Sequence, residues 1–172
     1  MSAIRVDTTG QGGLAFRAKR TLNTEMAGGE TMAFAFDFDP IHQILRSTFS
    51  GRVSDEDLLD HQRMVVLLAT SLDPRFGVAD LSGADPFEAT SDGMRDLAKL
   101  PPAMPHADRP RVIIAPSDYA FGMMHIFEVE GETTRPNLHV VRSESEAWAI
   151  LGVKMEEVKF GPISGAALGA SS

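Results

Sequence analysis

Residues 76–94 read FGVADLSGADPFEATSDGM, and this one stretch contains the signals that decide the fold class. The apolar run 76–81 predicts a buried strand, and the Ser, Gly, Asp and Pro residues of 82–86 predict a turn. The Thr-Ser-Asp-Gly segment 90–93 then opens a helix, with Thr90 or Ser91 as the N-cap. A strand that leads through a short loop into a helix is the repeating unit of α/β proteins.

Two strands and a helix are predicted on the N-terminal side of this stretch. Phenylalanine alternates with small or polar residues over 33–39, which predicts a half-buried strand. After a turn, residues 43–51 predict a second strand that pairs with the first as a hairpin. Ser54 and Asp57 have the spacing of a capping box. Apolar residues at helical spacing then define one buried helix face: Leu58, Val65, Leu68 and Leu72.

The alternation continues on the C-terminal side. The helix that follows Thr90 must end before Pro101. The apolar run 111–115 predicts a strand covered on both faces. Ser117 or Asp118 caps a third helix, which Gly131 ends.

A fifth strand over 138–141 and a second capping box, Ser143 with Glu146, complete the chain of elements. The order is β-β-α-β-α-β-α-β-α, which predicts an α/β fold: a mixed, mostly parallel five-stranded sheet with about four helices. The first strand is antiparallel at one side. We expect residues 1–31 to form a poorly ordered N-terminal extension, 32–152 the domain, and 153–172 a flexible C-terminal tail.

Composition excludes several classes of function. The 172 residues carry a formal net charge of −8, which argues against binding to nucleic acid or to anionic lipid. The chain has no cysteine, so disulfides and thiolate metal sites are excluded. No apolar run has the roughly 20 residues needed to span a bilayer. We therefore expect a cytoplasmic protein without a membrane span.

Three stretches in this order of elements resemble the STAS domain: DLSGADPFEATSDGM (80–94), IIAPSDYAFGMMHIFE (113–128) and LHVVRSESEAWAILG (138–152). That family includes the SpoIIAA-type anti-sigma-factor antagonists and a broad set of SpoIIAA-like bacterial proteins of uncharacterised function. The resemblance covers about residues 32–152 and implies a regulatory module that acts through protein contacts. In the antagonists, phosphorylation of a serine at a helix N-terminus switches partner binding, and the resemblance places that serine on Ser91 and the glycine after it on Gly93.

Ser91, with its neighbour Thr90, has two readings. A hydroxyl at a helix N-terminus faces unpaired N–H groups that favour an added phosphate. Nearby acidic residues oppose a second anion, so the sequence favours the simpler interpretation, in which Thr90 or Ser91 only caps the helix. Phosphorylation of Ser91 is the alternative.

No catalytic or metal motif is present. The five histidines lack ligand spacing such as His-Glu-x-x-His, and no Gly-x-Ser-x-Gly elbow or phosphate-binding loop occurs. We expect no enzyme, no catalytic residue, no metal and no cofactor. A site assembled from dispersed groups such as Asp118, Tyr119 and His125 is the weakest alternative.

The third predicted helix, 118–130, carries more apolar side chains than one core-facing stripe requires. Its N-terminal part is our candidate contact surface for a partner or ligand: Ser117, Tyr119, Phe121, Met123 and Met124. The sequence thus predicts a non-enzymatic regulatory or interaction module that binds a protein partner or self-associates. The alternative is a carrier of a small lipophilic ligand, with a pocket lined by Met and Phe side chains.

Overall fold

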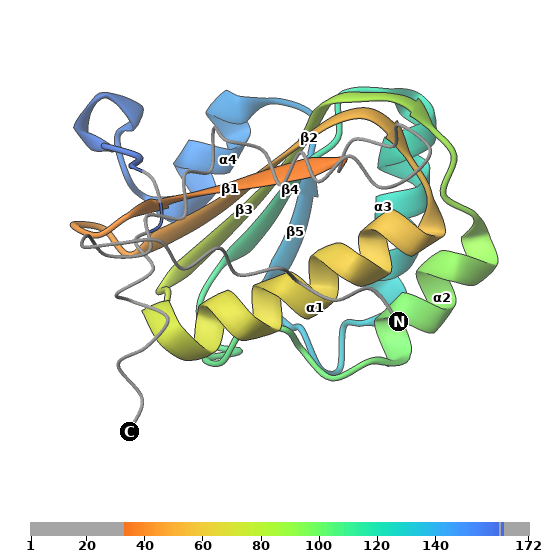
Figure 1. Ribbon diagram of the computed structural model, residues 1–172, viewed down its shortest axis with the longest axis horizontal. Helices are drawn as coiled ribbons and strands as arrows, with labels where there is room; N and C mark the ends of the chain where they lie inside the picture. Colours follow the sequence, from red (N-terminus) through yellow and green to blue (C-terminus); the bar gives the residue numbers. More distant parts are fainter. Residues whose placement is uncertain (1–32, 162, 164–172) are drawn as a thin grey trace, which may run out of the picture.

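The computed structural model describes residues 33–161 and 163, which form one mixed sheet with helices on both faces (Figure 1). The strands are β1 (Phe34–Asp39), β2 (Ile44–Val53), β3 (Phe76–Phe87), β4 (Arg111–Ile114) and β5 (Leu138–Val141). The helices are α1 (Asp55–Leu72), α2 (Ser91–Lys99), α3 (Asp118–Glu130) and α4 (Glu144–Leu151), followed by the short 3₁₀ helix η1 (Met155–Glu157). The predicted element order is confirmed.

The sheet has the strand order β1-β2-β3-β4-β5. β1 pairs with β2 antiparallel, and the other three pairings are parallel, as predicted. The carboxyl ends of β2 to β5 therefore lie at one edge of the sheet and their amino ends at the opposite edge. No helix of the described part of the chain is long and apolar enough to cross a membrane.

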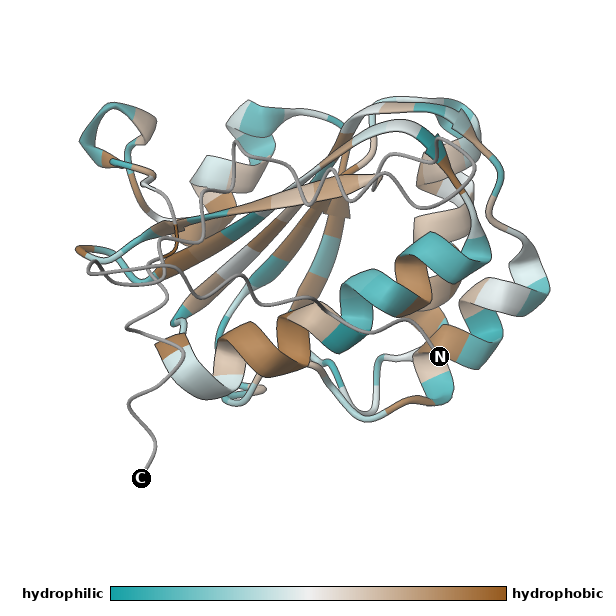
Figure 2. Cartoon of the chain, in the orientation of Figure 1, coloured by the Kyte–Doolittle hydropathy of each residue, from teal (hydrophilic) through white to brown (hydrophobic). Residues whose placement is uncertain are grey.

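Two apolar clusters hold the layers together, one on each face of the sheet. The larger cluster joins the sheet to α1, α2 and α3 through residues such as Leu68, Met94 and Phe127. The smaller cluster packs Trp148 of α4 against Val112 of β4. Figure 2 shows apolar colour along much of the strands and over parts of the helices.

Side-chain caps fix where the helices begin. The Ser54–Asp57 capping box is confirmed, with the Ser54 amide donating to Asp57 Oδ2 at 2.8 Å. Ser117 caps α3 and accepts from the Ala120 amide at 3.2 Å. Ser143 caps α4, but Glu146 bonds the Ser143 hydroxyl instead of its amide, so the second predicted box is only half formed.

β3 continues beyond the predicted strand, through the predicted turn, to Phe87. Its second half pairs with the end of β2 in an irregular register, for example Ser50 with Gly83 and Val53 with Phe87. A Cβ at Gly83 would lie 2.7 Å from the carbonyl oxygen of Phe49, so glycine is what permits this close approach. Tertiary pairing with β2 outweighs the local turn signals.

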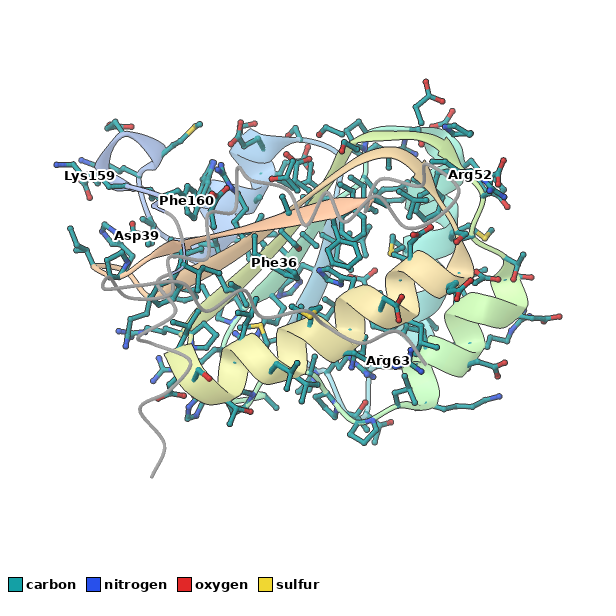
Figure 3. All side chains as sticks on the ribbon, viewed as in Figure 1. Phe36, Asp39, Arg52, Arg63, Lys159 and Phe160 are labelled. Carbon is teal, nitrogen blue, oxygen red and sulfur yellow. The ribbon has the colours of Figure 1, made fainter. Side chains whose placement is uncertain are left out.

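The described part of the predicted tail packs on the domain. Gly161 pairs with Phe38 at the outer edge of β1, through hydrogen bonds of 3.2 and 3.0 Å. Asp39, fully buried, accepts from the Lys159 amide at 3.1 Å, and the Arg46 guanidinium lies 3.8 Å from the centre of the Phe160 ring. Figure 3 shows Lys159 and Phe160 at the same end of the molecule as Asp39. The predicted extension 1–31 lies outside the described residues.

Candidate functional site

Residues that follow the carboxyl ends of β2, β3 and β4 form a group here called the carboxyl-edge cluster: Asp55, Thr90, Ser91, Ser117 and Tyr119. The sequence predicts site roles for the last four, whereas the part played by Asp55 emerges only from the structure. Thr90 is the N-cap of α2, and its Oγ1 accepts from the Gly93 amide at 3.0 Å. The same hydroxyl donates to Asp55 Oδ2 at 2.6 Å, and the Thr90 amide donates to Asp55 Oδ1 at 2.8 Å. Of the two predicted caps, Thr90 is therefore the one that is used.

The carboxylate of Asp55 occupies the N-terminus of α2. It lies so close to Gly93 that a Cβ there would overlap it. Ser91, the first residue of α2, is half-buried, and its hydroxyl forms no hydrogen bond with a described residue. An anion thus already lies where a phosphate on Ser91 would find the helix N-terminus. Phosphorylation of Ser91 or Thr90 stays a prediction.

The contact residues predicted on α3 do not share one surface. Tyr119 is 53% exposed, and its hydroxyl donates to the Ala89 carbonyl at 2.9 Å, which joins α3 to the start of α2. Phe121 is half-buried beneath the guanidinium of Arg142, which lies 4.1 Å from the ring centre. Met124 faces the core and is 3% exposed, so it offers nothing to a partner. The exposed N-cap Ser117 and the half-buried Met123 complete the set.

The three dispersed groups considered as an enzyme site are not brought together. His125 bonds Glu128 at 2.8 Å, and Asp118 pairs with Arg142 at 2.6 Å. The Tyr119 hydroxyl bonds a backbone carbonyl. In the described part of the chain, no group of three or more His, Cys, Asp or Glu residues is placed to hold a metal ion.

A cavity that the sequence did not predict lies at the opposite edge of the sheet, where the parallel strands begin. This α1 cavity has a volume of about 130 Å³ and is lined by all five strands, α1, α3 and the loops 102–109 and 134–137. Two rows of paired residues form its floor: Leu45-Gly77-Arg111-Leu138 and Phe36-Ser47-Ala79-Ile113. The hollow follows from β3, the middle strand, which contributes only Gly77 and Ala79 to these rows.

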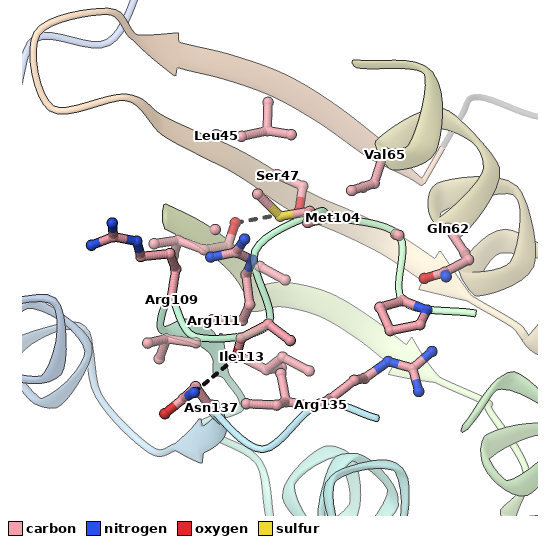
Figure 4. A pocket seen from close by; sticks show the side chains of 18 of the residues that line it. Leu45, Ser47, Gln62, Val65, Met104, Arg109, Arg111, Ile113, Arg135 and Asn137 are labelled. Carbon is pink, nitrogen blue, oxygen red and sulfur yellow. Dashed lines mark hydrogen bonds between the residues drawn. The ribbon is translucent and has the colours of Figure 1, made fainter. Parts of the chain in front are cut away.

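Figure 4 shows how the walls are arranged around that floor. Val65 and Gln62 come from α1, while Met104 comes from the loop that covers the amino ends of the strands. A Cβ at Gly77 would lie 2.8 Å from Met104 Sδ and 2.9 Å from Arg111 Cδ. Glycine at position 77 therefore lets both side chains lie close against β3.

His61 on α1 is the polar group at the aromatic end of the cavity. Its Nε2 lies 2.8 Å from Ser47 Oγ, and the Ser47 hydroxyl is 3.4 Å from the Val78 carbonyl. Its ring packs against Phe34, Phe36 and Phe49, with centroid distances of 5.4, 5.4 and 4.8 Å. Burial lowers the pKa of His61 to about 3, so the imidazole is neutral at pH 7.

Three arginines line the cavity, and two of them, Arg111 and Arg135, donate to backbone carbonyls, whereas Arg109 pairs with Asp108. Arg111 donates to the carbonyls of Arg75, Pro105 and Pro110 at 2.8–3.0 Å. Arg135 donates to carbonyls at the end of α2, including Ala98 at 2.9 Å and Leu100 at 2.8 Å. Burial lowers the pKa of Arg111 to about 10 and also lowers that of Arg135, and Arg111 is still charged at pH 7.

The two sites occupy opposite edges of the same sheet, and sequence reasoning found only one of them. The sequence signal for the cavity is a pair of small residues two positions apart, Gly77 and Ala79, which lie on the face of β3 toward α1. Comparison with models of protein families and with curated protein sequences finds no match for this chain. What the structure shows is a mixed five-stranded α/β fold.

Proposed function

We propose that this chain is a non-enzymatic binding module of the STAS-like class, and that it holds a small apolar ligand in the α1 cavity. The observation that carries the proposal is the cavity itself, about 130 Å³ between α1 and the hollow of β3. An engineered cavity of about 150 Å³ in another protein binds benzene, so a ligand the size of one aromatic ring or a short branched chain fits here. A long lipid does not fit this volume.

The polar groups of the cavity support binding more than catalysis. His61 and Ser47 are within hydrogen-bond distance, as in a nucleophile–base pair. No carboxylate among the described residues bonds His61, and a triad-like site needs such a third group to orient the base. With a pKa of about 3, His61 is also a poor proton acceptor at neutral pH.

A regulated protein contact or self-association is the second candidate function, favoured by the carboxyl-edge cluster. Tyr119 is half exposed and tied by its hydroxyl to Ala89, next to Thr90. The resemblance to STAS antagonists puts a switch serine at Ser91, the first residue of α2. Native mass spectrometry of the protein from its own source tests this: a phosphate mapped to Ser91 or a discrete complex supports it, and an unmodified monomer counts against it.

The cavity proposal is tested with benzene as the probe. We expect benzene to shift the NMR methyl resonances of Val65, Ile113 and Leu138, which line the cavity, in a saturable manner. Ala79→Leu fills the hollow of β3 and should abolish these shifts. Ala149→Leu makes the same change on the exposed surface of α4 and should leave them intact. Absence of saturable shifts in the unmodified chain would show that the cavity binds no such ligand.

A further inference from the structure

The arginines of the described chain separate into two groups by their partners. Six have an aspartate or glutamate oxygen within 4.0 Å: Arg46, Arg52, Arg63, Arg95, Arg109 and Arg142. Of the other three, Arg75 is exposed, whereas Arg111 and Arg135 are the two that burial desolvates. Both desolvated arginines line the α1 cavity. In a chain with 24 acidic and 16 basic residues, a shortage of carboxylates does not explain this.

Arg111 is the one with hydrogen-bonding capacity left. A guanidinium has five N–H donors. Nη1 uses two of them on the carbonyls of Arg75 and Pro110, and Nη2 uses one on Pro105. Nε and the second N–H of Nη2 have no partner among the described residues. Arg135 is closer to saturation, because its Nη1 and Nη2 each have two acceptors.

The position of Arg111 on the floor places this charge beside apolar surface. It pairs in register with Gly77 on one side and Leu138 on the other. Figure 4 shows Arg111 reaching toward the loop of Met104, while Arg109 is turned away to the side. A molecule that rests on Ile113 and Leu138 therefore lies next to the side chain of Arg111, which comes from the same floor of the cavity.

We propose that the ligand of the α1 cavity is a small apolar carboxylate, with its carboxylate bound by Arg111 and its apolar body lying over the hollow of β3. This inference rests on the proposed function and narrows it to one chemical class. Within the described chain, Arg111 donates only to backbone carbonyl oxygens. A carboxylate would offer two acceptor oxygens together with the full negative charge that these carbonyls lack. Arg135 also lines the cavity and adds positive potential there, and the proposal requires no direct hydrogen bond between Arg135 and the carboxylate.

The experiment compares benzoate with benzamide, its neutral counterpart of nearly the same shape, by calorimetric titration of the full chain near neutral pH. We expect benzoate to bind at least about tenfold more tightly, because a hydrogen bond to a charged group contributes more than one to a neutral group. This comparison uses the unmodified protein and so does not depend on a variant that folds.

Arg111→Met then removes the charge and keeps an apolar side chain. It should weaken benzoate at least about tenfold and leave benzamide within about a factor of two. Arg75→Met is the matched control: it removes one charge from an exposed arginine outside the cavity and should change neither affinity.

The outcomes separate the two proposals. Benzene binding with no preference for benzoate over benzamide overturns the carboxylate assignment and leaves the cavity proposal standing. Equal loss of benzoate and benzamide affinity in Arg111→Met also overturns it, since Arg111 would then only shape the cavity. If benzene, benzamide and benzoate all fail to bind, both proposals are wrong.

Discussion

At the scale of single residues, His61 makes the fold sensitive to acid. Its pKa of about 3 lies well below the ordinary histidine value of 6.5, because burial disfavours the charged ring. Between these two values the unfolded chain binds a proton that the folded chain does not, so stability falls as the pH falls through this range. Above about pH 6.5 His61 is neutral in both the folded and the unfolded chain, so its burial no longer makes stability depend on pH.

His61→Phe should remove this dependence while keeping an aromatic ring beside Phe36 and Phe49. Between about pH 6 and pH 4, the unfolding free energy of the variant should fall less steeply than that of the unmodified chain, by up to about 1.4 kcal/mol per pH unit. Urea denaturation at a series of pH values measures the two slopes. His125→Phe, at an exposed position, is the control and should keep the original slope. Parallel curves for His61→Phe would contradict the argument.

At the scale of elements, Asp39 joins the turn between β1 and β2 to the C-terminal segment 158–161. Burial alone would raise the pKa of Asp39. Hydrogen bonds from the His42 side chain and from the backbone amides of Ile41, His42 and Lys159 outweigh burial and hold this pKa below its ordinary value. The carboxylate accepts from the Ile41 amide at 2.8 Å and from His42 Nδ1 at 2.9 Å. One fully buried side chain thus fixes two segments that are far apart in the sequence.

Asp39→Asn replaces one acceptor oxygen by an N–H₂ donor and should lower the unfolding free energy by about 1–3 kcal/mol. It should also loosen the segment that Lys159 anchors, so trypsin should cleave after Lys154 and Lys159 faster than in the unmodified chain. Denaturant unfolding and timed digestion measure both effects. Asp60→Asn alters an exposed carboxylate that pairs with Arg63 and should change neither. A destabilised variant with unchanged cleavage would mean that Asp39 supports only the turn.

At the scale of the whole molecule, the sheet separates the cavity from the only tryptophan of the chain. Trp148 packs in the cluster beneath α4, on the face opposite α1, and is 7% exposed. We expect saturating benzoate to leave the Trp148 emission spectrum unchanged, while unfolding shifts it to longer wavelength. A saturable change with the same Kd as the calorimetric titration would show that the two faces are coupled through the sheet.

The order of the strands and helices could be read from the sequence because each element carries its own periodic pattern and its own cap. Helix α1, for example, combines the Ser54 capping box with a buried stripe that includes Val65 and Leu68. The sequence predicts too short a β3, because the turn signals at Gly83 and Pro86 are local, whereas the pairing with β2 that overrides them is a long-range contact.

The α1 cavity could not be predicted in the same way. Its floor takes single residues from strands that meet only in the folded sheet, and the register that puts Leu45, Gly77 and Arg111 in one row is not visible in any one segment. Arg111 itself reads in the sequence as the charged start of an apolar strand. No carboxylate forms an ion pair with Arg111 in the described chain, and Asp108 acts on it only through the longer-range field, which can be seen only once the surroundings of Arg111 are known.

The pairing of Gly161 with Phe38 has a consequence for association. An open strand edge is a template on which another chain can add a strand. At this edge the chain already carries its own competitor, tethered through η1 and held near Phe38 by Lys159. A short tether gives such a segment an effective concentration on the order of millimolar. A strand from another chain displaces it only if that strand binds the edge more tightly or is present at a comparable concentration. The chain's own C-terminal segment therefore competes with any second chain that would extend the sheet by pairing with β1.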